Sequence, residues 1–317
     1  MDQENGSAGD ANPTTAPSSA PAAVVGASGF LGTVLVRTLR AGGVRVAEYT
    51  RETPFLTGPG VPDDQLLSAR TVFWLATSIN PAVADAEPWR AQEDRDTFAS
   101  MLRTVGQLAN PPRIVLISSG GTVYDPAGEP PYREDSPTVP PSAYGQAKLA
   151  MEGCLLTAGP VGERGLVARV ANAYGPGQPA ASGQGVIAYW MRALARGEPI
   201  TLFGDPSTTR DFVYVDDIAE ALAAVHDHHA GPLPPVLNVG SGVPTSLGDL
   251  AEAVCDVTST PFSGVRRESA RGFDIPHSWL DVGLAGESLG WKPRTPLRTG
   301  LSAAWRHVLD AVGRGAR

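Results

Sequence analysis

The sequence predicts an α/β protein with a doubly wound parallel sheet and a smaller C-terminal lobe. Short, almost wholly apolar runs alternate with longer amphipathic stretches from Pro21 to about Tyr174. Continuous apolar strands separated by helices are typical of a parallel sheet that is covered on both faces. A glycine-rich loop joins the first apolar run to the first amphipathic stretch, and the pattern becomes less regular after Tyr174.

The composition limits the class of protein. The chain has 317 residues, of which 42% are hydrophobic and 18% are charged, as is ordinary for a globular protein of about two domains. A net charge of −8 without basic clusters argues against nucleic acid and anionic membranes as main partners. Because no apolar run is long enough for a membrane span, no secretory signal is seen and only two cysteines occur, we expect a cytoplasmic protein.

The elements are predicted in order from apolar periodicity. Residues 1–20 are rich in Ser, Pro, Ala and Gly, which predicts a disordered tail. Continuous apolar runs predict strands at 22–25, 44–49, 71–76, 113–118 and 166–171, and helical spacing predicts helices at 30–41, 90–109 and 143–157. Further on we expect a helix at 185–196, a strand pair within 200–214, a helix at 215–225, a strand at 235–239 and helices at 246–255 and 297–312.

The loop after the first predicted strand has the spacing of a dinucleotide-binding turn. In VVGASGFLG, residues 24–32, the glycines stand three residues apart. The first allows a tight turn, the second lets the backbone approach a pyrophosphate, and the third lets helix and strand pack closely. The helix N-terminus then offers free N–H groups to the phosphates. The residues expected to contact this cofactor are Gly26, Ser28, Gly29, Phe30, Leu31 and Gly32.

The end of the second predicted strand bears on the choice of dinucleotide. An NAD site usually has an acid there that binds the ribose 2′-hydroxyl, but Glu48 falls two residues early. Thr50 and Arg51 stand near the expected position, and an arginine beside a hydroxyl suits a 2′-phosphate. NADP(H) is therefore favoured, with NAD(H) as the alternative if Glu48 reaches the ribose. Ala76, which ends the predicted strand 71–76, is also assigned to the cofactor.

Tyr144 and Lys148 lie four residues apart at the start of a predicted helix. Residues at this spacing share a helix face, so the hydroxyl and the ammonium can reach one cleft. A cation near a phenol favours the phenolate, which makes Tyr144 a candidate acid–base for a carbonyl or carbinol. Lys148 is also one of only two lysines among 25 basic residues. Taken alone, the pair fits an ordinary amphipathic helix with a surface lysine equally well.

Further motifs follow in order, and together they carry a family resemblance. They are SSGGTVY at 118–124, RVANAYGPG at 169–177, TRDFVYVDD at 209–217 and LNVGSG at 237–242. With them the chain resembles the extended short-chain dehydrogenases/reductases of the NAD-dependent epimerase/dehydratase family, which act on nucleotide sugars. The resemblance implies a dinucleotide-binding Rossmann domain over 21–175, with 208–242 returning to it, and a lobe for the nucleotide sugar over most of 176–317.

The resemblance also implies roles for single residues. Tyr144 would be the general acid–base, and Lys148 would hold the nicotinamide ribose, so that both also contact the cofactor. Asn172 would contact the sugar nucleotide, and Arg210 and Arg271 would clamp its diphosphate. A homodimer through the helices at 90–109 and 143–157 is a further expectation of the family.

Some positions depart from the family pattern. Members commonly carry a catalytic Ser or Thr where this chain has Gly120, so a neighbouring hydroxyl must replace it. We expect Ser119, which is also assigned to the substrate, with Thr122 and Ser118 as alternatives. The acid pair that 4,6-dehydratases use is Gly121 and Thr122 here, which disfavours elimination of water. The segment before Thr71 is short, so one βα unit is expected to be trimmed.

These observations predict an NAD(P)-dependent oxidoreductase that acts on a nucleotide sugar. The favoured reaction is 4-keto reduction of an NDP-4-keto-6-deoxyhexose, dTDP-linked, in deoxysugar biosynthesis. A nucleotide-sugar 4-epimerase that keeps NAD bound is the first alternative. A non-catalytic NADP-binding protein, which Gly120 would suit, is the second. We interpret residues 226–229 (HDHH) as a solvated helix end rather than a metal site, and Glu134 and Asp135 as solvated loop charges.

Overall fold

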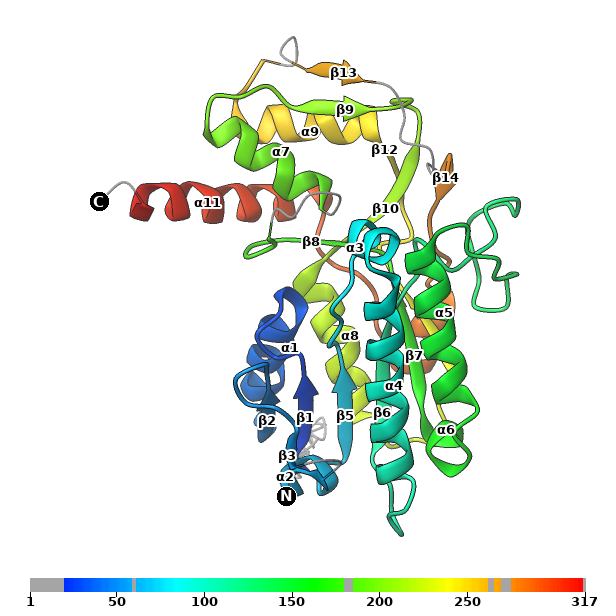
Figure 1. Cartoon of the computed structure of the whole chain (residues 1–317). Coiled ribbons are helices and arrows are strands. Elements are labelled where there is room, and N and C mark those ends of the chain that lie inside the picture. Colours follow the sequence, from blue (N-terminus) through cyan, green and yellow to red (C-terminus); the bar gives the residue numbers. More distant parts are fainter. Residues whose placement is uncertain (1–19, 59–60, 180–184, 262–264, 269–274, 316–317) are drawn as a thin grey trace, which may run out of the picture.

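The computed structural model describes residues 20–58, 61–179, 185–261, 265–268 and 275–315. A six-stranded parallel sheet forms the lower part of the molecule, and a lobe of helices and short strands lies beyond the carboxyl ends of its strands (Figure 1). In sheet order the strands are β11 (Val236–Val239), β7 (Leu166–Val170), β6 (Arg113–Ser119), β5 (Thr71–Trp74), β1 (Ala22–Val25) and β2 (Val46–Tyr49). The order reverses between β1 and β5, where a doubly wound sheet opens its ligand crevice.

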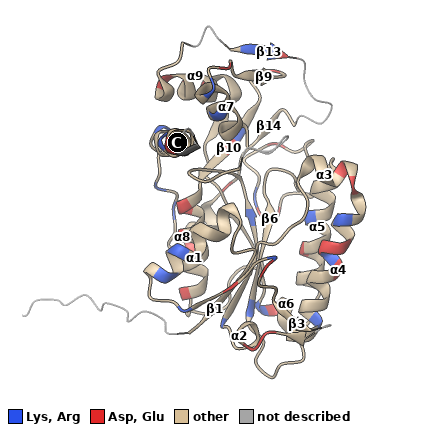
Figure 2. Cartoon of the chain, turned by 60° about the vertical axis from the view of Figure 1, so that its left-hand side comes forward, with Lys and Arg blue, Asp and Glu red and all other residues tan. Residues whose placement is uncertain are grey.

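Helices cover both faces of the sheet, which explains why β1, β5 and β7 are buried at every residue. Helices α1 (Phe30–Ala41) and α8 (Val215–Asp227) lie on one face, and α4 (Pro88–Val105) and α5 (Ala143–Leu156) lie on the other (Figure 2). One core cluster joins the sheet to Leu35 and Ile218 of the first pair. Another joins it to Phe98 and Met151 of the second pair. The predicted α/β class with a doubly wound parallel sheet is therefore confirmed.

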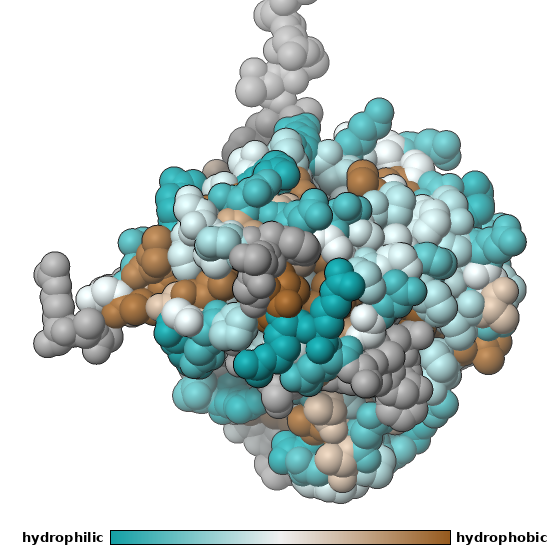
Figure 3. Space-filling view, turned by 90° about the horizontal axis from the view of Figure 1, so that it is seen from above, coloured by the Kyte–Doolittle hydropathy of each residue, from teal (hydrophilic) through white to brown (hydrophobic). Residues whose placement is uncertain are grey.

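The lobe is built around its own apolar cluster. Its helices are α7 (Val186–Ala195), α9 (Leu247–Thr258) and α11 (Leu297–Gly315), and Trp190 donates a hydrogen bond to the Thr201 carbonyl (2.8 Å) inside the cluster. Apolar side chains continue along α11 towards its exposed end, at the left of the view from above (Figure 3). Leu309 and Val312 of this end are 47% and 49% exposed. Across the part of the chain that the structure describes, none of the helices has the length and apolarity to cross a bilayer.

The shorter elements complete the chain between these parts. Next to the sheet they are β3 (Leu56–Gly58), β4 (Val61–Pro62), α2 (Asp64–Leu67), α3 (Pro81–Ala86), α6 (Pro160–Arg164) and α10 (Gly283–Leu289). Nearer the lobe they are β8 (Asn172–Tyr174), β9 (Thr201–Phe203), β10 (Thr209–Tyr214), β12 (Pro244–Ser246), β13 (Arg266–Glu268) and β14 (His277–Ser278). Between β2 and β5 the chain makes only the β3–β4 hairpin and the short α2, which is the expected trimmed unit.

The two strands expected as a pair within 200–214 do not pair with each other, so that prediction is wrong. Both strands exist, but β9 pairs with β13, whereas β10 pairs with β8, β12 and β14. The physical reason is the path of the chain, since β9 stays at the outer edge of the lobe while β10 runs back towards the sheet and enters α8 (Figure 1). By contrast, the predictions of a strand at 22–25 and a helix at 30–41 are confirmed to the residue.

Candidate active site

The glycine loop has the close packing that its spacing predicts. Gly26 has a φ of +94°, which favours glycine, and a Cβ at Gly32 would lie 2.2 Å from the Gly26 carbonyl oxygen. Gly29 is the N-cap of α1 and offers no side-chain acceptor to the first turn. The N–H groups of that turn are therefore left for an external acceptor, so the loop fits a pyrophosphate. Ser28 is exposed beside it, and Phe30 and Leu31 reach the neighbouring pocket.

The residues expected near the adenosine ribose lie in a turn after β2. The Thr50 hydroxyl accepts the N–H groups of Glu52 and Thr53 (both 3.1 Å), so it orders the turn in which Arg51 is exposed. Glu48 lies earlier in the strand, and its carboxylate pairs with Arg40 at 2.5 Å. The alternative partner for the ribose is thus already held by an arginine of α1. Ala76 follows β5 and borders the glycine loop, since a Cβ at Gly26 would lie 2.8 Å from the Ala76 nitrogen.

A pocket of about 380 Å³ opens beside this loop, between the sheet and the lobe. It brings together Ser119, Thr122, Tyr144 and Asn172, which come from the ends of three different elements and a loop. Several other residues line the pocket that were not predicted as site residues, among them Pro81, Tyr174, Gln178, Val186 and Phe212. Gln178 directly follows the motif RVANAYGPG, and that position was the available signal.

Helix α5 presents Tyr144 and Lys148 to one place. The helix begins after Ser142, whose hydroxyl accepts the Gly145 N–H at 3.1 Å. Lys148 is 6% exposed; its Nζ lies 5.7 Å from the centre of the Tyr144 ring and donates to the Ile117 carbonyl at 3.4 Å. No carboxylate among the described residues pairs with this ammonium. A buried ammonium has three protons to donate, so Lys148 is able to bind further acceptors in the site.

The hydroxyl groups around Gly120 have separate surroundings. Ser118 is buried and donates to the Glu152 carboxylate, which removes it from the alternatives for a hydroxyl in the pocket. Ser119 ends β6 at the pocket, and the Thr122 hydroxyl oxygen is buried there without a hydrogen-bond partner among the residues that the structure describes. A Cβ at Gly120 would lie 2.6 Å from Leu280 Cδ1, so a side chain at that position would require Leu280 to shift.

The residues assigned to the substrate lie around β10. Asn172 donates to the Asp211 carbonyl at 2.9 Å, and Arg210 Nη1 donates to the carbonyls of Thr209 (2.9 Å) and Ile275 (2.6 Å). Burial raises the pKa of Asp211, against the opposing hydrogen bonds from Ser241, Gly242 and Leu280. Arg271 lies outside the residues that the structure describes.

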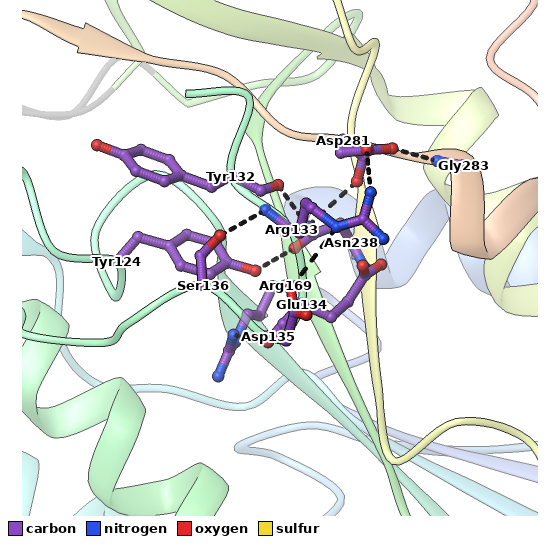
Figure 4. Close-up of polar contacts among 10 residues, drawn as sticks. All are labelled: Tyr124, Tyr132, Arg133, Glu134, Asp135, Ser136, Arg169, Asn238, Asp281 and Gly283. Carbon is purple, nitrogen blue, oxygen red and sulfur yellow. Dashed lines mark hydrogen bonds and ion pairs between the residues drawn. The ribbon is translucent and has the colours of Figure 1, made fainter. Parts of the chain in front are cut away.

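Two predictions about polar residues are wrong. Glu134 is not a solvated charge, because its carboxylate accepts the Asn238 N–H at 2.9 Å and its carbonyl accepts from Arg169 at 3.2 Å (Figure 4). His226 is not part of a solvated helix end, since it is fully buried and contacts the Thr71 hydroxyl at 3.1 Å. Over the ranges described above, no group of three or more potential ligands is placed to hold a metal ion.

The comparisons with known proteins agree with this geometry. The family model described as "NAD dependent epimerase/dehydratase family" matches residues 22–240. The chain is 33% identical to a dTDP-6-deoxy-L-talose 4-dehydrogenase (NAD(P)(+)) of Kitasatospora kifunensis, over 92% of this chain and 97% of the relative. It is 30% identical to a UDP-glucose 4-epimerase of Mycolicibacterium smegmatis, over 88% and 95% respectively.

The fold has close counterparts among solved structures. The UDP-glucose 4-epimerase of Thermotoga maritima, solved with UDP-glucose, superposes with a TM-score of 0.82 at 26% identity, covering 92% of this chain and 99% of that one. Other structures that the chain resembles hold NAD or NADPH. The chain therefore belongs to the NAD-dependent epimerase/dehydratase family of extended short-chain dehydrogenases/reductases, and it is an NAD(P)-dependent enzyme rather than a non-catalytic binding protein.

Proposed function

We propose that this enzyme is an NADP(H)-dependent 4-ketoreductase of a nucleotide sugar, acting on an NDP-4-keto-6-deoxyhexose. One observation carries the oxidoreductase part. Tyr144 and Thr122 line the pocket at the carboxyl edge of the sheet, beside the glycine loop, and the buried Lys148 Nζ lies 5.7 Å from the centre of the Tyr144 ring. That arrangement offers a proton donor and a hydrogen-bond donor at the pocket, with a cation beside the proton donor.

The chain's own residues account for the proton and the developing charge. The glycine loop and Lys148 would hold a reduced nicotinamide dinucleotide, which when bound would supply a hydride to the carbonyl carbon. The Tyr144 hydroxyl then gives its proton to the carbonyl oxygen, so that hydride and proton together convert the ketone into a carbinol. Thr122 donates a hydrogen bond to that oxygen as negative charge develops, and Ser119 is the second donor. Lys148 stabilises the tyrosinate that is left and holds the ribose hydroxyls of the cofactor.

The substrate assignment is supported by the residues at the mouth of the pocket and by the relatives. Asn172 lines the pocket, and Arg210 lies on the adjoining strand, where with Arg271 it would bind the diphosphate. The relative from Kitasatospora kifunensis is named for a dTDP-6-deoxysugar and for its 4-position. Gly121 and Thr122 stand where 4,6-dehydratases have their acid pair. The absence of acids at these two positions favours hydride transfer without elimination of water.

The preference for NADP(H) is supported by the turn after β2. Arg51 is exposed there beside the Thr50 hydroxyl, whereas the Glu48 carboxylate is bound by Arg40. An exposed guanidinium suits a 2′-phosphate, and Glu48 would have to bind a 2′-hydroxyl while it also pairs with Arg40.

The test is a turnover assay with NADPH and a dTDP-4-keto-6-deoxyhexose, following the absorbance of the reduced nicotinamide. We expect consumption of one NADPH for each carbinol formed. Tyr144→Phe should lower kcat by about 10²- to 10⁴-fold and still bind NADPH. Consumption of NADPH that is unchanged in Tyr144→Phe would contradict the assignment.

The second candidate is a UDP-glucose 4-epimerase, which the similarity to the Thermotoga maritima and Mycolicibacterium smegmatis enzymes favours. The cofactor found in the purified protein distinguishes an epimerase from a ketoreductase. An epimerase would carry NAD through purification and interconvert UDP-glucose and UDP-galactose without net consumption of reduced cofactor. A ketoreductase must exchange its cofactor in every turnover.

A further inference from the structure

An ion pair lies buried beneath the helix that carries Tyr144 and Lys148. Arg169 Nη2 is 2.7 Å from Glu152 Oε2, and the two side chains are 6% and 1% exposed. Arg169 Nε adds contacts of 3.2 and 3.1 Å to the two carboxylate oxygens, and Ser118 donates its hydroxyl to Oε1. Both carboxylate oxygens of Glu152 therefore accept hydrogen bonds from residues of β6 or β7.

The position of Glu152 along α5 relates it to the proposed catalytic pair. Tyr144, Lys148 and Glu152 follow each other at intervals of four residues, so they lie along one face of the helix. Two successive residues of β6 bind two successive turns of that face, because Lys148 donates to the Ile117 carbonyl at 3.4 Å and Ser118 donates to Glu152. These contacts fix both the rotation of α5 and its height against the sheet.

Arg169 extends the same anchor to the loop that leads into α5. Its guanidinium lies 4.9 Å from the centre of the Tyr124 ring and donates to the Glu134 carbonyl at 3.2 Å. The Tyr124 hydroxyl donates to Asn238 at 2.7 Å, and the Asn238 N–H donates to the Glu134 carboxylate at 2.9 Å (Figure 4). The loop that ends in the N-cap Ser142 is thus held by the arginine that also holds Glu152 in the third turn of the helix.

A buried ion pair is a poor source of stability. The cost of removing two charges from water often equals or exceeds their attraction, and apolar replacements of similar volume are often neutral or stabilising. Burial by itself lowers the pKa of Arg169, but the hydrogen bonds and charge of Glu152 outweigh it and leave that pKa above its ordinary value. Compared with an apolar contact, the directed hydrogen bonds between Arg169 and Glu152 add a fixed orientation and a fixed register of α5 against the sheet.

We propose that Glu152 is a positioning residue, which through Arg169 and Ser118 holds α5 in the orientation that places Tyr144 at the pocket and Lys148 beside the Tyr144 ring. The inference rests on the proposed function, because it assumes that Tyr144 and Lys148 do the chemistry. It predicts that loss of the carboxylate lowers kcat far more than it weakens substrate binding.

Two variants and one control separate positioning from mere stability. Glu152→Gln keeps the length of the side chain but leaves Arg169 without its counter-charge. The double variant Glu152→Leu/Arg169→Met replaces the pair by apolar groups and keeps the protein folded if the single variant is too unstable to purify. Glu163→Gln changes an exposed glutamate of α6 and serves as the matched control.

The expected kinetic result is a loss of about 100-fold in kcat for Glu152→Gln and for the double variant, with little change in KM, as for a displaced catalytic group. The double variant should recover the melting temperature of the wild type without recovering its kcat. Recovery of both would overturn the proposal, because it would show that the pair only stabilises the fold. Glu163→Gln should match the wild type.

A second measurement is independent of turnover. The chain has only two lysines, Lys148 and Lys292, of which Lys292 is exposed, so acylation of each by an amine-reactive reagent can be followed by mass spectrometry with Lys292 as internal standard. We expect the labelling ratio of Lys148 to Lys292 to rise in Glu152→Gln without any ligand. An unchanged ratio would overturn the proposal. Failure of NADPH to protect Lys148 in the wild type would instead count against the proposed function, so the two failures are distinguishable.

Discussion

Gly145 of α5 lies in backbone contact with the carbonyl oxygen of Thr122, because a Cβ at Gly145 would lie only 2.3 Å from that oxygen. It would also lie 2.8 Å from the Cβ of Pro140. The glycine directly after Tyr144 thus lets the start of the helix sit against the loop that carries the unpartnered Thr122 hydroxyl. Tyr144 and Thr122 can therefore lie close together only because residue 145 has no Cβ.

The first prediction concerns this contact. Gly145→Ala should move the start of α5 away from Thr122 and lower kcat by about 10- to 100-fold, since a displacement near 1 Å suffices for such a loss. Steady-state kinetics and a NADPH titration measure it, and cofactor affinity should change much less than kcat. Gly153→Ala is the control in the same helix, where a Cβ would meet none of the described residues within 4 Å. It should keep full activity and gain up to about 1 kcal/mol in unfolding free energy.

The second prediction separates the two candidate hydroxyls. Thr122→Val keeps the shape of the side chain but removes the donor, and we expect a loss of about 10²- to 10³-fold in kcat. Thr122→Ser should retain most of the activity, and Ser119→Ala should lose less than Thr122→Val. The reverse order would assign the main role to Ser119. Adding Gly120→Ser to Thr122→Val should not restore turnover, because the new side chain would have to displace the Leu280 side chain and would crowd the Arg169 carbonyl oxygen.

Local patterns allowed much of this to be predicted from the sequence. The strand 22–25, the helix 30–41 and the pair Tyr144 and Lys148 depend on apolar runs and on a spacing of four residues, both of which are visible within a short window. Contacts across long separations could not be read in this way. The bond from Asn238 to Glu134 joins residues 104 positions apart, and neither partner lies in a pattern that indicates the other.

The same limit explains the errors. Glu134 lies among prolines and charges, which is typical of a solvated loop, and only the folded sheet brings the Asn238 N–H to its carboxylate. The strands within 200–214 are adjacent in sequence, which favours a hairpin, but β10 pairs with strands from other parts of the chain. Ser118 and Ser119 are adjacent and chemically identical, and both border the pocket, but only the fold shows that Ser118 donates its hydroxyl to the buried Glu152 carboxylate.

The third prediction concerns the cofactor. Arg51→Ala should raise KM for NADPH by about 10- to 100-fold, the size expected when a hydrogen bond to a charged group is lost, and leave KM for NADH nearly unchanged. Steady-state kinetics with both cofactors give the ratio of the KM for NADPH to the KM for NADH in each variant. Arg45→Ala removes an exposed arginine just before β2 and is the matched control. Equal effects on NADPH and NADH would remove Arg51 from the phosphate site and favour the epimerase.

The fourth prediction is a pH dependence of stability. His226 is fully buried against Thr71, and burial lowers its pKa below the ordinary value of about 6.5. Asp227 opposes this shift, while Arg70 and His229 add to it. Below about pH 6.5 the imidazole takes up a proton more readily in the unfolded chain than in the native protein. The free energy of unfolding is therefore not reduced by His226 above about pH 6.5, and it decreases as the pH falls below that value.

Replacing the imidazole should remove this part of the acid sensitivity. We expect His226→Gln to be less stable than the wild type at neutral pH, because a buried contact is disturbed, but to lose less unfolding free energy between neutral and mildly acidic pH. Urea unfolding at a series of pH values measures both slopes. His307→Gln, which replaces an exposed histidine of α11 far from this contact, should keep the slope of the wild type. If His226→Gln also keeps that slope, another group is responsible for the acid sensitivity, because a neutral amide cannot take up the proton that unfolding adds.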